Sequence, residues 1–120
     1  MKSYTDLEQS KKLAKILPIE SADMSWVEKE NAKHTWYDAE NRRIITKYEK
    51  KYYIPCWSLA ALLKILSDIT DYSFELVFLK RTTDGRANTL EDVYRLSTDV
   101  YDVYKKEAVD ACYEIIIKNY

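Results

Sequence analysis

The sequence predicts an α+β fold in which three helices pack on one face of a small, mainly antiparallel sheet of three to five strands. Two observations predict it. Apolar residues recur at helical spacing in three segments, and other segments either alternate with period two or are rich in aromatic and β-branched residues. With 120 residues, of which 47% are hydrophobic, the chain has the length of one domain. We therefore expect residues 1–120 to form a single domain with one core.

The first predicted helix covers about residues 6–17. Apolar and small residues recur along it at helical spacing, and Pro18 ends it. Thr5 and Glu8 have the spacing of a capping box, in which each side chain bonds a backbone amide at the start of the helix. Residues 21–24 then predict a turn or a short helical corner.

Polar residues fill the segment 28–42, which is either a loop or a hairpin. Side chains in the segment 42–54 alternate with period two, which predicts a strand with one face in water. The triplet 49–51 is polar throughout, so a turn that divides this segment into two short strands stays open.

The second predicted helix begins after Pro55. Ser58 is its candidate N-cap. Trp57 and Leu62 stand at the two positions of a hydrophobic staple, a contact that fixes the angle at which the chain enters a helix. The apolar stripe of this helix consists of Leu59, Leu62, Leu63 and Leu66.

Two further strands and a helix are predicted after it. The segment 72–81 is apolar on both faces, which predicts a central strand, and Asp84-Gly85 predicts a turn. Residues 89–104 fit either a helix or two strands, and we favour strands at about 93–97 and 100–104 that turn at Thr98-Asp99. The last helix follows, with an apolar stripe of Ala108, Ala111, Cys112, Ile115 and Ile116.

The predicted core gathers apolar residues of these segments: Leu13, Leu17, Trp57, Leu59, Leu62, Leu63, Phe74, Leu76, Phe78, Cys112, Ile115 and Ile116. Both cysteines, Cys56 and Cys112, lie within apolar segments, and two are too few for a disulfide scaffold. We therefore expect two buried thiols. With the single histidine, His34, they also fall short of the four ligands of a zinc site.

Three blocks of the sequence resemble a known family. They are QSKKLA at 9–14, continuing to LP at 17–18 and ESADM at 20–24, then PCWSLAALL at 55–63, and VDACYE at 109–114. Together they are similar to a family of short uncharacterised proteins of Bacteroides-group gut bacteria and of their phages and mobile elements. The resemblance implies a shared fold and brings no known activity. Members often have a cap residue and a proline before the last block, where this chain has Lys106-Glu107, so the start of the last helix is less defined.

Composition and charge exclude several classes of function. Nineteen basic and twenty acidic residues give a net charge of −1, so no overall field attracts nucleic acid or an anionic membrane. The sequence begins without the apolar run of a signal peptide, and no stretch approaches the roughly eighteen apolar residues of a membrane span. A single glycine excludes a glycine-rich phosphate loop. We expect a cytoplasmic protein that binds no membrane.

No group of residues predicts catalysis or a bound metal. His34 is the only side chain with an ordinary pKa near neutrality, and a catalytic pair with Cys56 would need a closeness that the sequence does not show. The spacings of Asp99, Asp102, Glu107 and Asp110 suit a hard cation, but no ligand loop with its turn glycine contains them. We expect a solvated acidic rim, no cofactor, no metal and no enzyme activity.

Tyrosine content and one basic segment instead predict binding. Eleven tyrosines are a high count, and tyrosine supplies contact area with few rotors to half-buried strands and to interfaces. The candidate binding surface lies in the segment 42–53. Its anchors are Tyr48, Tyr52 and Tyr53, and its charged rim consists of Arg43, Lys47 and Lys51.

The sequence thus predicts a non-enzymatic accessory protein of a phage or mobile element that binds an unidentified protein or a second copy of itself. The alternative is a small nucleic-acid-binding module that uses the basic segment 42–53. On a continuous strand Tyr48 and Tyr52 point away from Arg43, Lys47 and Lys51, whereas stacking and phosphate contacts to a nucleic acid share one face. The two functions differ in salt dependence, because phosphate contacts weaken steeply as salt rises.

Overall fold

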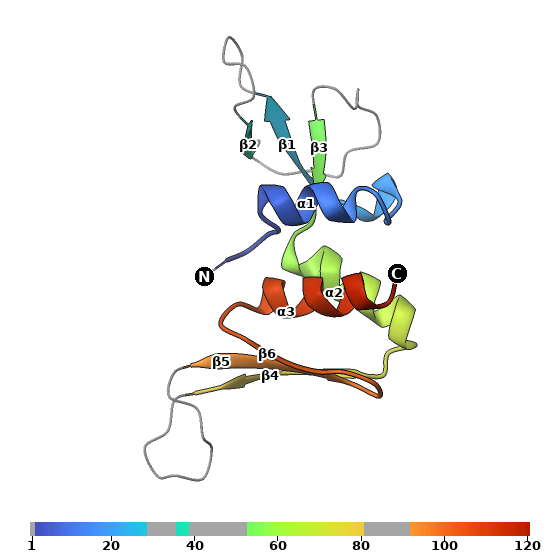
Figure 1. Cartoon of the computed structure of the whole chain (residues 1–120), viewed down its shortest axis with the longest axis vertical. Helices are drawn as coiled ribbons and strands as arrows, with labels where there is room; N and C mark the ends of the chain where they lie inside the picture. Colours follow the sequence, from blue (N-terminus) through green and yellow to red (C-terminus); the bar gives the residue numbers. More distant parts are fainter. Residues whose placement is uncertain (1, 29–35, 39–52, 81–91) are drawn as a thin grey trace. The chain divides into compact units, whose positions relative to one another are not determined.

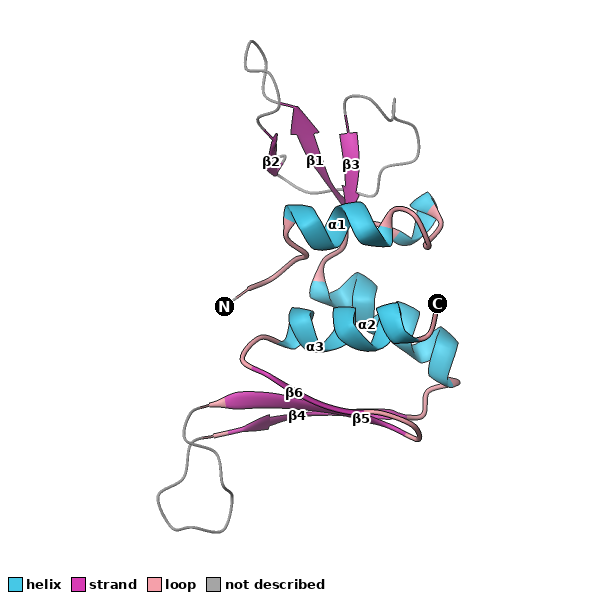
Figure 2. Cartoon of the chain, in the orientation of Figure 1, coloured by secondary structure: helices cyan, strands magenta, loops and turns pink. Residues whose placement is uncertain are grey.

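The computed structural model describes residues 2–28, 36–38, 53–80 and 92–120. Over these residues the fold is α+β, as the sequence predicts (Figures 1 and 2). The elements in order are α1 (Leu7–Leu13), the 3₁₀ turn η1 (Ile19–Ser21), β1 (Met24–Glu28), β2 (Trp36–Asp38), β3 (Tyr53–Cys56), α2 (Leu59–Thr70), β4 (Phe74–Leu79), β5 (Val93–Thr98), β6 (Asp102–Lys105) and α3 (Ala108–Lys118).

The strands of these residues form two antiparallel sheets, so the prediction of a single sheet is wrong. One sheet has the order β2-β1-β3 and the other β4-β5-β6. The chain divides into two compact units, which we name the N-terminal unit (residues 3–62) and the C-terminal unit (residues 63–120 with residues 1–2). Strand patterns along the sequence do not reveal which strands share a sheet, because pairing depends on residues far apart in the chain.

In the N-terminal unit, α1 begins with a capping box one residue later than predicted. The Asp6 carboxylate accepts the Gln9 N–H at 2.8 Å, and the side-chain oxygen of Gln9 accepts the Asp6 N–H at 3.0 Å. Thr5 is fully buried, and its N–H donates to the carbonyl of Trp57 at 2.9 Å. The Thr5 side chain is buried and bonds interior groups, so it does not cap the helix. The helix ends at Leu13, and a turn leads to the proline that was predicted to end it.

The sheet of this unit has β1 at its centre. β1 pairs with β2, so the polar segment between 28 and 42 contains the second strand of a hairpin. On its other side β1 pairs with β3, which contains Pro55. A proline has no N–H to donate and is tolerated at a sheet edge. The predicted strand at 42–54 lies outside the described residues except for its last two positions.

The start of α2 confirms the prediction made for Ser58. Its side-chain oxygen accepts the N–H of Ala61 at 3.1 Å, and its carbonyl accepts the N–H of Leu62 at 3.0 Å. Trp57 and Leu62 are both fully buried, as the two members of a hydrophobic staple should be. The helix therefore begins where the local sequence predicts.

In the C-terminal unit, the ambiguous segment 89–104 forms the two strands β5 and β6, as favoured. They turn where the Thr98 N–H donates to the Tyr101 carbonyl at 2.8 Å. α3 packs against β5 and β6 (Figure 1). Its predicted apolar stripe is buried. The helix follows Glu107, which makes no side-chain cap bond, as expected for a start without a good capping residue.

The prediction that β4 is a central strand is wrong, and five of the twelve predicted core residues are half-buried or exposed. β4 is an edge strand, since among the described residues only β5 pairs with it. Phe78 is 50% exposed, and Leu59, Leu63, Phe74 and Leu76 are only half-buried. An apolar pattern on both faces does not show whether a second strand covers the outer edge.

The buried hydrophobic residues fall into two sets, one in each unit. Those of the N-terminal unit are Leu13, Leu17, Ala22, Met24, Cys56, Trp57 and Leu62. Those of the C-terminal unit are Ile65, Leu66, Leu96, Val103, Ala108, Val109, Ala111, Cys112, Ile115 and Ile116. Within the described part of the chain, no helix is long and apolar enough to cross a membrane.

Candidate protein-interaction site

Most of the predicted binding surface lies outside the described residues. This holds for Arg43, Lys47, Tyr48, Lys51 and Tyr52, and also for His34 and the turn at Asp84-Gly85. Tyr53 is the first residue of β3 and lies opposite Val27 of β1. That surface stays a prediction, and the structure bears on other candidates.

Buried polar groups of the N-terminal unit bond one another around Thr5. Its side-chain oxygen lies 2.8 Å from the Ser10 oxygen and accepts the Trp57 N–H at 3.1 Å. The Cys56 thiol donates to the Thr5 carbonyl at 3.4 Å, and the indole N–H of Trp26 donates to Ser10 at 3.1 Å. These contacts satisfy buried donors and acceptors, which is a structural role.

A serine–carboxylate pair stands at the start of α2. The Ser58 hydroxyl donates to one oxygen of Asp23, and the Ser58 N–H donates to the other at 2.9 Å. The same hydroxyl oxygen accepts the Ala61 N–H, so its lone pair serves the helix cap. A carboxylate bonded directly to a serine is too weak a base to make the hydroxyl a nucleophile. Asp23 therefore orients a cap.

Hydrogen bonds to side chains join two of the three sequence blocks for which a resemblance was noted. Ser21 and Asp23 belong to the first block, and Trp57 and Ser58 to the second. The indole N–H of Trp57 donates to the Ser21 hydroxyl at 2.9 Å, beside the bonds between Ser58 and Asp23. These residues hold the fold of the N-terminal unit together.

Both cysteines are buried thiols, as predicted, and neither is in a disulfide. Burial raises the pKa of Cys112 to about 12, because a thiolate loses its hydration in an apolar interior. The thiolate is the reactive form, so Cys112 does not act as a nucleophile near neutral pH.

The four acidic residues near α3 each accept hydrogen bonds, and two of them share Lys2 as the donor residue. Asp102 accepts two bonds from the Arg95 guanidinium, at 2.9 and 3.2 Å; these bonds lower the pKa of Asp102 and raise that of Arg95. Asp110 accepts a bond from the Lys2 ammonium at 2.6 Å, and Glu107 accepts the Lys2 backbone N–H at 2.9 Å. Among the described residues no cluster of histidine, cysteine and acidic side chains could hold a metal ion.

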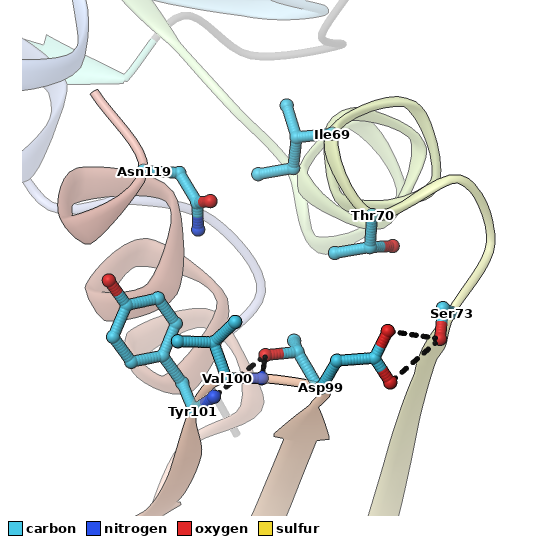
Figure 3. Close-up of a pocket in the computed structure, with 8 residues that line it drawn as sticks. Ile69, Thr70, Ser73, Asp99, Val100, Tyr101 and Asn119 are labelled. Carbon is cyan, nitrogen blue, oxygen red and sulfur yellow. Dashed lines mark hydrogen bonds between the residues drawn. The ribbon is translucent and has the colours of Figure 1, made fainter.

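Asp99, the fourth acidic residue, lines a shallow pocket of about 180 Å³ in the C-terminal unit (Figure 3). Ser73 donates to its two carboxylate oxygens at 3.2 and 3.3 Å. The side-chain oxygen of Thr98 accepts the N–H groups of Val100 and Tyr101, and these two bonds close the turn that contains Asp99. The lining carries one carboxylate and neither a cysteine nor a histidine, so the pocket presents no acid–base pair.

The outer edge of β4, the edge turned away from β5, is the candidate site. In the sheet that contains β4, the other edge is β6, which has four residues with the charged Asp102 and Lys105 at its ends. In the other sheet, the edge strand β3 contains Pro55. Short length, proline and charge are the features that keep edge strands from pairing with another chain. β4 has six residues, no proline and one charge, that of Glu75.

Side chains beside this edge are apolar on both faces. Phe78 is half exposed and lies against Tyr94 of β5, with ring centroids 5.0 Å apart. Phe78, Leu76 and Phe74 share the face of the buried Leu96, because the register places Leu76 opposite Leu96. Val77 and Leu79 lie on the opposite face. No strand of the described residues pairs with this edge, and the side chains beside it are apolar on both faces apart from the exposed Glu75.

Sequence reasoning identified β4 as a strand and missed its position at a sheet edge. Its apolar character on both faces was interpreted as burial in the centre of a sheet. The same character in an edge strand favours pairing with another chain. Comparisons with protein-family models, with curated proteins and with solved structures found no match to this chain.

Proposed function

We propose that this protein is a non-enzymatic binding module that holds a protein partner by adding a strand to the outer edge of β4. The observation that carries the proposal is the contrast between this six-residue, mostly apolar edge and β6, the other edge of the same sheet, which has four residues with a charge at each end. In strand addition the backbone groups of the edge give affinity, and alternate side chains give specificity. Phe78 and Leu76 are the specificity side chains on one face.

The cellular setting is part of the proposal. Two buried thiols outside any disulfide fit a reducing compartment, which supports action in the cytoplasm. The resemblance of three sequence blocks to short proteins of phages and mobile elements supports an accessory role in such an element. The segment 42–53 stays a second candidate contact region.

A photo-crosslinking amino acid placed at Phe78 tests this function in the native host. The matched control carries the same amino acid at Tyr120, which is exposed to a similar extent, 59% against 50%, and lies at the end of the chain after α3. We expect ultraviolet light to join a protein chain to the Phe78 variant and not to the control. Mapping of the adduct should place the link within an extended segment of the partner.

Amide hydrogen exchange of the isolated complex provides the second readout. Alternate N–H groups of β4 point away from β5 and exchange with solvent until a strand covers them. We expect those amides to slow in the complex. If Phe78 captures no protein and the purified chain instead binds an oligonucleotide with an affinity that falls steeply with salt, the nucleic-acid alternative replaces this proposal.

A further inference from the structure

We propose that the partner at β4 is a second copy of this chain, with the two β4 strands antiparallel and Leu76 opposite Leu76 at a twofold axis. This inference rests on the proposed function and names its partner. The β4-β5-β6 sheet of one copy and that of the other would join into one continuous sheet across the axis. Both copies would then cover their outer β4 edges, and a closed dimer would form.

Ladder geometry restricts how two copies of one strand pair. In an antiparallel ladder, opposed residues turn their backbone groups the same way, either both toward the partner or both away from it. A twofold pairing must therefore be centred on a residue that lies opposite itself. Within Phe74–Leu79, only centres at Leu76 and Val77 overlap most of the strand.

Side-chain pairing favours the centre at Leu76. There Phe74 lies opposite Phe78 of the other copy, twice, with the two Leu76 side chains between them. Aromatic pairs are among the cross-strand pairs that stabilise sheets most. A centre at Val77 would place Phe74 opposite Lys80 and Glu75 opposite Leu79, which separates both aromatic side chains from aromatic partners.

Charges on the opposite face favour the same register. Val77 lies opposite Arg95 of its own β5, so the centre at Leu76 places Glu75 of the second copy in one row with Val77 and Arg95. The Arg95 guanidinium is bonded to Asp102 of its own chain, and two strand spacings, roughly 10 Å, separate it from that Glu75, so the attraction is weak. With the centre at Val77, the two Arg95 positions would stand three strand spacings apart, roughly 14 Å, where their charges are screened. The charges therefore favour the Leu76 register only slightly, and the pairing of Phe74 with Phe78 decides it.

The length of β4 sets the expected strength of association. Six residues of antiparallel strand span about 20 Å. Such an edge buries less surface than a standard stable interface, so the dimer should be weak and depend on concentration.

Two variants at one position test the register and the partner together. In the proposed dimer, position 77 lies opposite Glu75 of the other copy. Val77→Lys therefore creates two attractive pairs, and Val77→Glu creates two repulsive ones. We expect the Lys variant to dimerise about tenfold more tightly than the Glu variant in sedimentation equilibrium.

The thermal stability of the monomer should rank the two variants in the opposite order to their dimer affinity. Position 77 lies opposite Arg95 within the chain, so Val77→Glu gains an attractive neighbour and Val77→Lys a repulsive one. The thermal midpoint in dilute solution should be higher for the Glu variant. A variant that dimerises less because it is misfolded is thereby distinguished from one that repels its partner. The double variant Glu75→Lys with Val77→Glu should recover dimerisation.

Disulfide trapping then identifies the centre of the pairing. Mild oxidation should join Leu76→Cys into a covalent dimer faster than Val77→Cys, while the natural chain, whose two cysteines are buried, should stay uncrosslinked. Faster trapping of Val77→Cys would overturn the proposed register. A chain that stays strictly monomeric would show that the partner is not a second copy. If the crosslinker at Phe78 then captures another protein, the proposed function still holds.

Discussion

The side-chain oxygen of Thr5 accepts the backbone N–H of Trp57 at 3.1 Å, which connects the segment before α1 to the segment before α2. Two backbone hydrogen bonds connect the same two segments. The Thr5 N–H donates to the Trp57 carbonyl at 2.9 Å, and the Leu59 N–H donates to the Ser3 carbonyl at 3.0 Å. Thr5 is fully buried, so its hydroxyl has protein partners in place of water. Residues 3–5 are therefore part of the fold of the N-terminal unit.

Thr5→Val should lower the free energy of unfolding by about 1–3 kcal/mol, because it leaves the buried Trp57 N–H without its side-chain acceptor and removes the partner of Ser10. Urea denaturation measures the change. Thr5→Ser keeps the hydroxyl and should lose less than the valine variant. Equal stability of the valine variant and the natural chain would contradict this role.

Ser58→Ala should lower the free energy of unfolding by about 0.5–2 kcal/mol, since the Ala61 N–H loses its cap and Asp23 loses a donor. The matched control is Ser73→Ala, which removes an exposed hydroxyl that donates to Asp99 and should change stability by no more than about 0.5 kcal/mol. The architectural role fails if Ser58→Ala keeps full stability and abolishes binding.

Leu62→Ala should cost about 2–5 kcal/mol of unfolding free energy, because Leu62 is fully buried and its removal leaves a cavity. Leu63→Ala removes the same atoms from the neighbouring, half-buried position and should cost clearly less. Both values come from denaturant titrations with unchanged slope. An equal cost at the two positions would show that burial does not govern the difference.

Cys112 should make the protein less stable in alkali. Its pKa is raised to about 12 from 9.0, so between these values the folded state keeps a proton that the unfolded state loses. Unfolding then releases a proton, and the free energy of unfolding falls as pH rises, by at most about 1.4 kcal/mol per pH unit from this group. Cys112→Ala removes that contribution. Its stability should fall less between about pH 9 and pH 10.5 than that of the natural chain; parallel curves would contradict the assignment.

Asp102 should titrate below its ordinary value of 3.8, because the hydrogen bonds from Arg95 favour the carboxylate. The small stabilisation from this exposed pair is present above pH 3.8 and is lost as pH falls through the lowered pKa. Carboxyl carbon shifts in an NMR titration measure it. Arg95→Gln should return the pKa of Asp102 toward 3.8, and Glu75→Gln, which leaves the ion pair intact, should not. An unchanged midpoint in Arg95→Gln would exclude the pair as the cause.

Features that depend on neighbouring residues were predictable from the sequence. The cap at Ser58 bonds a residue three positions on, and the turn at Thr98 closes within four residues. The apolar stripe of α3 reflects helical spacing along eleven residues. Each of these follows from local geometry, which the order of residues fixes.

Features that depend on distant residues needed the tertiary structure. Thr5 has the spacing of a capping residue, yet Trp57, far along the chain, gives its side chain a buried role and moves the capping box to Asp6. β4 is recognisable as a strand from its sequence, but its place at a sheet edge follows from β5 being its only strand partner among the described residues. Its side chains alone do not show whether another strand covers its outer edge, because pairing depends on residues far apart in the chain. The sequence by itself determined the helices α2 and α3, the strands β4, β5 and β6 and the cap at Ser58, whereas strand pairing between distant segments decided the sheets, the edge of β4 and hence the candidate site.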